Sequence, residues 1–177
     1  MKMNTYIQNF TKQLSEALEI GDASKFLNPK KKYSNILICG LGGSGIGGTI
    51  VNDILSPLLG VPILSSKDYS VPNFVDKNTL AIFSSYSGNT EETLFALKEC
   101  QNRKTEICII TSGGKLEVIA KNNNYNTIIV PANHPPRAMF GYSFTQIFFM
   151  LSNYGIITDN FKNDFKKTIL LLTKEEE

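Results

Sequence analysis

Short apolar runs alternate along the chain with longer amphipathic stretches. Five runs are closed by glycine, serine or proline, and they read NILICGLG from residue 35, VPILSS from 61, TLAIFSSYS from 79, EICIITSGG from 106 and NTIIVPA from 126. Runs of this length and composition predict short β-strands. Their apolar residues are nearly continuous rather than alternating, which is typical of strands that are buried on both faces of a sheet.

The stretches around these runs have helical potential. We predict helices over residues 4–20, 44–57, 90–102, 115–122, 143–154 and 159–173, on apolar spacings such as Phe161, Phe165, Ile169 and Leu172. Strands that alternate with helices indicate βαβ units and a parallel sheet. The expected fold is therefore α/β, a three-layer α/β/α sandwich with a five-stranded parallel sheet, in which ligands bind at the carboxyl ends of the strands.

The length of the chain sets its domain organisation. At 177 residues, with 42% hydrophobic and 19% charged residues, it has room for one globular domain and not for a second. We divide it into an N-terminal helix and polar linker (1–34), a central domain (35–155) and a C-terminal helix (156–177). The last helix ends in TKEEE without a glycine or proline stop, so it either continues into further sequence or frays in solvent.

Composition argues against several classes of partner. The net charge of +2 and the single basic cluster PKKKY argue against nucleic acid. No signal-like apolar segment begins the chain, and QIFFMLSNYGII is too short to span a bilayer. Three cysteines form no CxxC pair, and Cys39 and Cys108 lie inside apolar runs, which predicts reduced, buried thiols. We therefore expect a cytoplasmic protein with no metal site.

A glycine-rich segment, CGLGGSGIGGT, follows the first predicted strand. Gly40, Gly42 and Gly45 satisfy GxGxxG, whose side-chain-free positions let backbone N–H groups approach an anion at a helix N-terminus. A dinucleotide site also needs an acidic residue about 20 positions onward. Only Asp68 is available, and it lies past the end of its strand. A tight turn with glycines for packing alone accounts for two or three of the six glycines.

A hydroxyl-rich segment, FSSYSGNTEET, follows the third predicted strand. Asn89 or Thr90 can cap the next helix, and Glu91 and Glu92 complement the dipole of its first turn. One cap needs only one side chain, however. The cluster of hydroxyls around Gly88 therefore favours a phosphate cradle, built from Ser84, Ser85, Ser87 and Thr90 with backbone N–H groups and the helix dipole.

Four motifs in this order resemble one known family. GLGGSGIGG, SYSGNTEET, TSGGKL and PPRAMFGY, between about residues 35 and 145, resemble the sugar isomerase (SIS) domain, which is flavodoxin-like or Rossmann-like in fold. PPRA narrows the resemblance to the N-terminal SIS domain of the bifunctional phosphoglucose/phosphomannose isomerases. These enzymes interconvert glucose or mannose 6-phosphate with fructose 6-phosphate without a cofactor or metal.

The resemblance implies roles for particular residues. Ser85, Ser87 and Thr90 match the hydroxyls that hold the sugar phosphate. Gly43 and Ser44 match contacts to the substrate from the first loop. Arg137 matches a catalytic arginine that faces the reacting carbons, where a fixed guanidinium stabilises the negative charge of an enediolate. Without the resemblance, a lone arginine is more simply read as part of a surface ion pair.

The family's other catalytic groups have no matching position here. They are a glutamate base, a ring-opening histidine from the partner subunit, and a lysine from the second SIS domain. We do not assign ring opening to His134, the only histidine, and Lys115 is expected to decorate a turn, with a sugar contact as the alternative. The chain by itself is therefore expected to bind a sugar phosphate with negligible turnover.

Three functions remain open at this point. The chain is the N-terminal half of an isomerase, a stand-alone sugar-phosphate-binding module or regulator, or an NAD-dependent oxidoreductase that relies on GxGxxG. The resemblance also implies a homodimer, for which we expect the apolar helices near residues 143–173 to form the interface. Preference between glucose and mannose substrates is left open.

Overall fold

The computed structural model describes residues 3–27 and 32–175. Its sheet has five parallel strands in the order β2-β1-β3-β4-β5, where the strands are β1 Asn35–Cys39, β2 Ile63–Ser66, β3 Thr79–Ser84, β4 Glu106–Thr111 and β5 Asn126–Ile129. Each strand lies within one of the five predicted runs. The chain moves outward from β1 to β2 and then crosses back to β3, so the strand order reverses between β1 and β3. In parallel sheets, ligands bind in the crevice at such a switch point.

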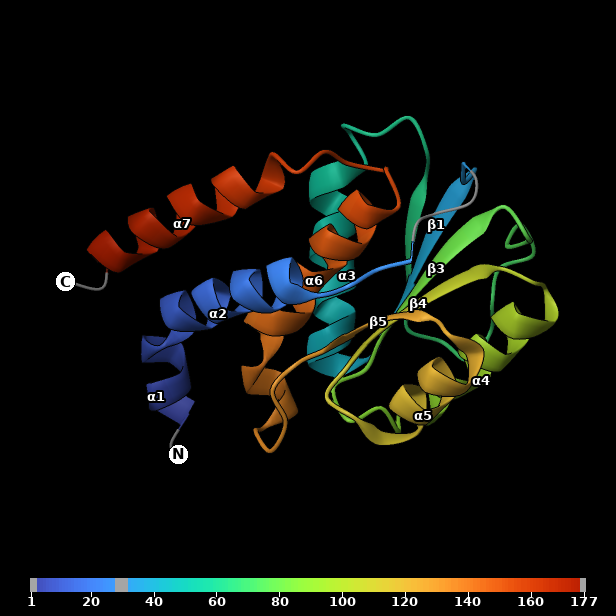
Figure 1. Cartoon of the computed structure of the whole chain (residues 1–177), viewed down its shortest axis with the longest axis horizontal. Coiled ribbons are helices and arrows are strands. Elements are labelled where there is room, and N and C mark those ends of the chain that lie inside the picture. Colours follow the sequence, from blue (N-terminus) through green and yellow to red (C-terminus); the bar gives the residue numbers. More distant parts are fainter. Residues whose placement is uncertain (1–2, 28–31, 176–177) are drawn as a thin grey trace.

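Helices cover both faces of the sheet, which confirms the predicted three-layer α/β/α sandwich (Figure 1). One face carries α3 Gly42–Leu55 and α6 Phe140–Asn153, and the other carries α4 Glu91–Asn102 and α5 Gly114–Asn123. The helices outside α6 are α2 Phe10–Ala23 and α7 Phe161–Glu175, and the remaining short pieces are α1 Met3–Gln8 and the 3-10 turn η1 Pro136–Ala138. The outer end of α7 projects away from the body of the molecule (Figure 1).

Two apolar cores explain the unbroken hydrophobic runs. Ile36, Ile38 and Ile82 belong to the core beneath α3 and α6. Their neighbours Leu37 and Phe83 belong to the core beneath α4 and α5. Because successive side chains of a strand point to opposite faces, a strand that is covered on both sides needs apolar residues at nearly every position.

The N-terminal helix departs from the prediction. Residues 4–20 were expected to form one helix, but the chain has two, with a break at Asn9. Asn9 leaves helical geometry, with a φ of −98° and a ψ of 18°, and its side-chain amide shares the carbonyl of Thr5 with its own N–H, at 2.7 and 3.1 Å. The second helix also continues past residue 20 and ends at Ala23, beyond Gly21. Gly21 lies inside α2, where a Cβ would meet the ring of Phe149 at 2.3 Å.

The three cysteines are buried and unpaired, as the sequence predicted. Burial raises the pKa of the Cys100 thiol to about 11 and raises the pKa values of Cys39 and Cys108 as well. Because the thiolate is the reactive form, these side chains serve as core residues. Within the described parts of the chain, no helix is both long enough and apolar enough to cross a bilayer.

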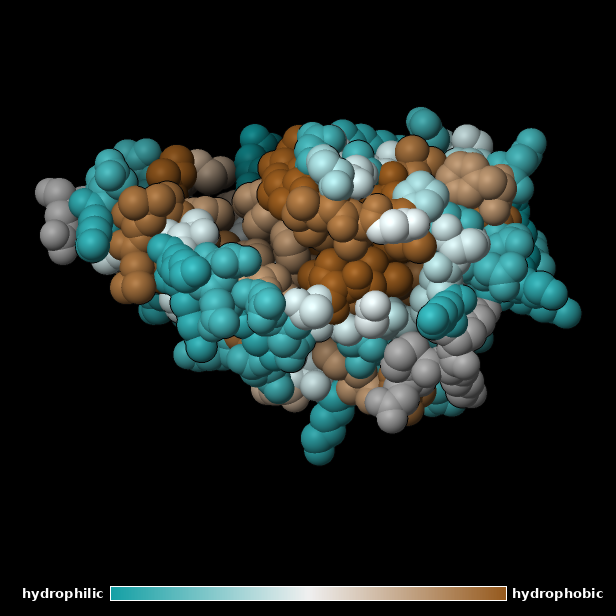
Figure 2. Space-filling model, turned by 90° about the horizontal axis from the view of Figure 1, so that it is seen from above, coloured by the Kyte–Doolittle hydropathy of each residue, from teal (hydrophilic) through white to brown (hydrophobic). Residues whose placement is uncertain are grey.

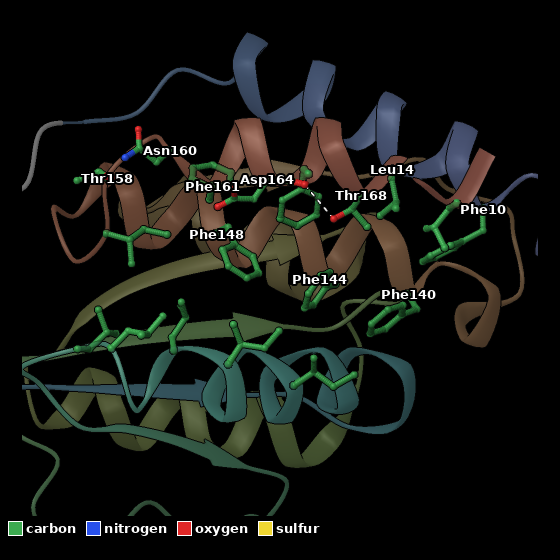
Figure 3. Close-up of a pocket in the computed structure, with 18 residues that line it drawn as sticks. Phe10, Leu14, Phe140, Phe144, Phe148, Thr158, Asn160, Phe161, Asp164 and Thr168 are labelled. Atoms are coloured by element: carbon green, nitrogen blue, oxygen red, sulfur yellow. Dashed lines mark hydrogen bonds between the residues drawn. The ribbon is translucent and has the colours of Figure 1, made fainter. Parts of the chain in front are cut away.

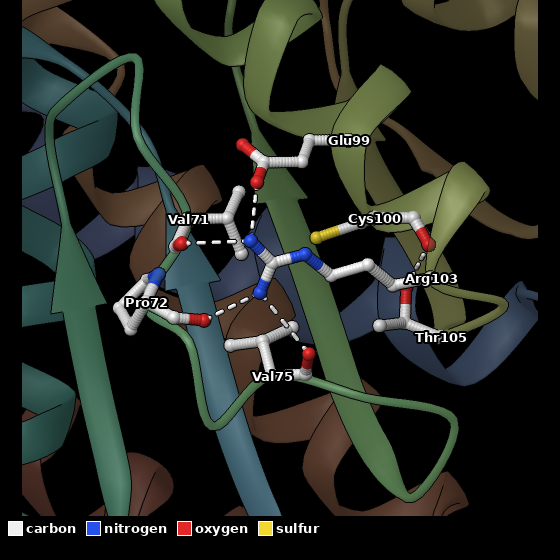
Figure 4. Close-up of polar contacts among 7 residues, drawn as sticks. All are labelled: Val71, Pro72, Val75, Glu99, Cys100, Arg103 and Thr105. Carbon is white, nitrogen blue, oxygen red and sulfur yellow. Dashed lines mark hydrogen bonds and ion pairs between the residues drawn. The ribbon is translucent and has the colours of Figure 1, made fainter.

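Arg103 ties the β2–β3 connection to the end of α4 (Figure 4). Its guanidinium donates to the carbonyls of Pro72 at 2.6 Å, Val75 at 3.2 Å and Val71 at 3.1 Å. It also contacts the carboxylate of Glu99 one turn earlier in α4. The connection therefore satisfies three of its carbonyls with a side chain from another element.

Replacing this arginine tests how much the connection depends on it. We expect Arg103→Ala to lower the free energy of unfolding by about 2–3 kcal/mol, because three carbonyls lose charge-assisted hydrogen bonds. Urea unfolding followed by circular dichroism measures the change. Lys98→Ala, at an exposed position of the same helix, is the control and should change stability by less than about 0.5 kcal/mol. Equal stability of the two variants would contradict this account.

Candidate functional site

Two loops leave the sheet side by side at its switch point. Cys39, the last residue of β1, pairs with Phe83 of β3. The glycine loop (residues 40–45) and the serine loop (residues 84–90) therefore begin next to each other. They are in contact, since the N–H of Tyr86 donates to Ser44 Oγ at 3.3 Å. The two segments that the sequence singled out for anion binding face one another.

The hydroxyls of these loops keep O–H groups available for a ligand. Ser85 Oγ and Thr90 Oγ1 are 2.8 Å apart, so this pair uses one of its two O–H groups. Ser44 and Ser87 each accept from a main-chain N–H, which leaves their own O–H groups without an acceptor in the described residues. Ser87 is exposed, whereas Ser44 and Ser85 are buried. Three O–H donors of these four residues thus remain where the two loops meet, and the buried hydroxyl of Ser84 has no partner in the described residues either.

Helix capping does not account for these hydroxyls. Thr90 is the N-cap residue of α4, as the sequence allowed, but its hydroxyl makes no capping bond and instead pairs with Ser85. Leu41 precedes α3 and has no capping side chain. The first N–H groups of a helix lack intrahelical acceptors, and its N-terminus carries partial positive charge. Two helices, α3 and α4, begin at this edge of the sheet.

The glycines of the first loop are largely required by the fold. A Cβ at Gly40 would lie 2.8 Å from the carbonyl oxygen of Ser84, and one at Gly45 would lie 2.6 Å from the carbonyl oxygen of Gly40. Gly42 has a φ of +58°, in the left-handed region that favours glycine. The GxGxxG pattern in this chain is therefore explained by a tight strand-to-helix turn, which could bind any anion and is not specific for a dinucleotide.

Arg137 lies across the glycine loop. A Cβ at Gly43 would be 3.2 Å from the carbonyl oxygen of Pro136 and 3.5 Å from Cα of Arg137, so the backbone of η1 rests on this glycine. The side chain of Arg137 is exposed. Within residues 3–27 and 32–175 its guanidinium forms no ion pair or hydrogen bond, so the alternative of a surface ion pair finds no partner there.

A loop after β4 supports the serine loop from the other side. The N–H of Leu116 donates to the carbonyl of Gly88 at 3.0 Å, and the N–H of Lys115 donates to Asn89 Oδ1 at 3.1 Å. A Cβ at Gly88, where φ is +67°, would lie 1.8 Å from the carbonyl oxygen of Gly113. The first turn of α5 is therefore engaged in holding the serine loop, and the Lys115 side chain points from it into solvent.

The other residues considered from the sequence lie outside this arrangement. Asp68 is exposed, two residues beyond β2. His134 is half-buried, with its Nδ1 3.0 Å from the hydroxyl of Tyr6. In the described ranges, no group of three or more His, Cys, Asp or Glu side chains is placed to hold a metal ion.

A large cavity lies away from the two loops. This apolar groove, of about 700 Å³, runs between α3 and the pair α6 and α7, and aromatic side chains point into it (Figure 3). Its lining includes Ile54, Leu58, Phe144, Phe148, Phe161 and Phe165. A sugar phosphate needs hydrogen-bond donors for its charge and hydroxyls, and the groove offers few. The hydroxyl-lined edge of the sheet is therefore the better anion site.

Comparison with known proteins agrees with this geometry. Residues 30–156, which include all of these loops, match the family model described as "SIS domain". The chain belongs to the SIS domain family. This membership accounts for the sheet, the switch point and the four motifs together.

Individual relatives of this SIS chain carry different names. It is 36% identical over 151 residues to the "Bifunctional phosphoglucose/phosphomannose isomerase" of Caldicellulosiruptor bescii, a match that covers 85% of the chain and 44% of the relative. It is 36% identical over 143 residues to the "D-glucosamine-6-phosphate 4-epimerase" of Sulfolobus acidocaldarius, which covers 76% and 45%. The chain thus spans less than half the length of these curated relatives.

A solved structure shows the same fold. The C-terminal domain of glucosamine-fructose-6-phosphate aminotransferase from Francisella tularensis matches with a TM-score of 0.69 and 16% identity, over 97% of this chain and 55% of that one. At this identity the likeness establishes the architecture of the SIS chain and nothing about its ligand.

Sequence reasoning missed the residues that hold the loops together. Tyr86, Asn89 and Ser112 lie within the motifs SYSGNTEET and TSGGKL, but these motifs do not show that the three residues bond across loops far apart in the chain. Gly88 was noted only as the centre of the hydroxyl cluster. Its contact with Gly113 depends on the pairing of β3 with β4.

The Gly88 contact can be tested directly. We expect Gly88→Ala to lower the free energy of unfolding by about 3 kcal/mol or more, because the added methyl group meets a backbone oxygen at a positive φ. Gly60→Ala is the matched control, since a Cβ there meets nothing within 4 Å. Urea midpoints compare the two, and a Gly88→Ala protein as stable as Gly60→Ala would show that the loops are not interlocked.

Proposed function

We propose that this chain binds a phosphorylated sugar with the phosphate held between the glycine loop and the serine loop. One observation carries the proposal. Three O–H donors of Ser44, Ser85, Ser87 and Thr90 remain without an acceptor in the described residues, where two helix N-termini meet. Hydroxyls, N–H groups and helix dipoles together can hold a phosphate dianion without a lysine.

We assign roles within the site on this basis. Ser85, Ser87 and Thr90 bind the phosphate. Gly43 and Ser44 contact the sugar and its phosphate from the facing loop. Arg137 is the catalytic residue of this chain, because its backbone rests on Gly43 and its exposed guanidinium has no partner in the part of the chain that the structure describes. There it stabilises the charge that develops as a proton leaves a sugar carbon next to a carbonyl.

The reaction we propose is aldose–ketose isomerisation between glucose or mannose 6-phosphate and fructose 6-phosphate. The name of the C. bescii relative supports it. A proton transfer between two carbons needs a base, and ring opening needs an acid. We place both in sequence beyond residue 177, because the relatives are more than twice as long as the matched segment.

The second relative supports this division of labour. A protein named as a 4-epimerase has the same 36% identity to this chain as one named as an isomerase, over a somewhat shorter match. A shared first half is expected if it holds the phosphate while other groups determine the chemistry.

We further propose that residues 156–177 lead toward a second SIS domain. We also propose that the protein works in the cytoplasm, where its buried thiols stay reduced.

A non-catalytic sugar-phosphate-binding module or regulator remains the second function. The unpaired donors support it equally, since binding needs no base. The NAD-dependent alternative has less support for two reasons. Asp68, the acidic residue that it needs, lies beyond β2. It also gives the serine loop no role. Addition of NADH, monitored by its fluorescence, should give no saturable change.

Binding of fructose 6-phosphate tests the proposal. In isothermal titration calorimetry we expect the chain to bind it and Ser87→Ala to weaken binding about tenfold, through loss of one hydrogen bond to a charged group. Ser70→Ala, in an exposed loop before β3, should leave affinity unchanged. Turnover by the 177-residue chain should be negligible. Unchanged binding by Ser87→Ala would refute the proposed phosphate site. Robust turnover would refute the proposal that the catalytic base lies outside these 177 residues.

We also propose that the chain forms a homodimer through the apolar groove. Apolar side chains gather on the face from which α7 leaves the body of the molecule (Figure 2). Leu58, in the turn that follows α3 at the rim of the groove, is 74% exposed, and Ile54 of α3 is 47% exposed. Contiguous exposed apolar surface of this kind marks an interaction site, and a second copy of the chain is the occupant we propose.

A charge in the groove tests this interface. We expect sedimentation equilibrium to show a dimer whose dissociation constant rises about 30-fold or more in Leu58→Asp, because a carboxylate is then desolvated at the contact. Val118→Asp, on the opposite helical layer and also well exposed, is the control. A wild-type protein that stays monomeric at all concentrations would contradict the proposal.

A further inference from the structure

Tyr86 uses every polar group it has to join neighbouring loops. Its N–H donates to Ser44 Oγ of the glycine loop at 3.3 Å. Its carbonyl accepts from both the N–H and the hydroxyl of Ser112, at 3.0 and 2.6 Å, in the loop after β4. The main chain of one residue thus fixes the serine loop between its two neighbours.

The side chain of Tyr86 reaches a fourth loop. Its hydroxyl donates to the carbonyl of Pro131 at 2.8 Å and accepts from the N–H of His134 at 3.0 Å. Between these two residues, Asn133 has a φ of +66°. Asparagine adopts this left-handed conformation more readily than most other non-glycine residues. The two hydrogen bonds of the phenol bracket the turn around it.

The bracketed turn leads directly to Arg137. No bond between main-chain groups is found for residues 131–134 in the described chain, whereas the 3-10 turn that follows has its own, from Ala138 and Met139. Tyr6, from α1, adds a second support to this turn through the ring of His134. After Arg137, the side-chain amide of Gln13 donates to the carbonyl of Ala138 at 2.8 Å. The turn before Arg137 depends on side-chain bonds, and the two from Tyr86 link it to the serine loop itself.

We infer that Tyr86 is a positioning residue whose hydroxyl holds the Arg137 loop in register with the phosphate-binding serine loop. The inference rests on the function proposed above. It also gives His134 a role, since its main-chain N–H bonds to Tyr86 and its ring bonds to Tyr6, and both bonds hold the turn before Arg137. The ring of Tyr86 packs against the core beneath α3 and α6. Tyr86→Phe keeps that packing and removes only the hydroxyl, so the bracket can be tested without creating a cavity.

The first measurement needs no ligand. In hydrogen exchange of the full chain, we expect peptides that cover residues 131–139 to exchange about tenfold faster in Tyr86→Phe, because the N–H of His134 loses its acceptor and the turn opens. Tyr6→Phe should have a smaller effect in the same direction. Tyr125→Phe removes a phenol that accepts from Gln101 on the other face and should change nothing there. Unchanged exchange in Tyr86→Phe would overturn the inference.

The second measurement is a double-mutant cycle on fructose 6-phosphate affinity. We expect Arg137→Ala to weaken binding about tenfold in the wild-type background and about threefold or less in Tyr86→Phe, because the arginine is no longer held in place. An equal loss in both backgrounds would overturn the inference while leaving the binding function intact. If the wild-type chain does not bind the sugar phosphate, the proposed function fails and the role of Tyr86 fails with it, whatever the exchange data show.

Discussion

The pairing of β1 with β3 is the constraint on which the site depends. These strands are separated in sequence by β2, yet Cys39 and Phe83 lie side by side at the carboxyl edge of the sheet. Their loops must therefore emerge together, and the helices that follow start from the same place. Two helix N-termini and a group of hydroxyls then share one small region, which is a favourable environment for an anion.

The molecule separates its polar and apolar surfaces. The strands are buried between two helical layers, so polar groups that could bind a ligand lie in the loops at the edge of the sheet. The large groove is lined by aromatic and aliphatic side chains and is suited to another protein surface. The chemistry of the two linings, and not cavity size, supports the proposed anion site at the hydroxyls.

Much of this arrangement could be predicted from sequence because it is encoded locally. The glycine, serine or proline that closes each apolar run marks the strand ends, and the GxGxxG and serine segments stand directly after β1 and β3. The break at Asn9 was missed because only the φ and ψ of this residue depart from the helix, while the apolar spacing and the main-chain bonds to Thr5 and from Gln13 continue through it. The hydroxyl of Thr90 was open to two readings, and only the position of Ser85 distinguishes pairing from capping. The bond from Tyr86 to Pro131 spans 45 residues and depends on strand order, which local patterns do not specify.

A crystal structure of the chain with fructose 6-phosphate tests the central claim most directly. We predict that phosphate oxygens lie within hydrogen-bonding distance of the hydroxyls of Ser87 and Thr90 and of the first N–H groups of α3, with the sugar extending toward Arg137. A phosphate bound elsewhere, such as beside Lys162 on α7, with the two loops empty, would contradict the account.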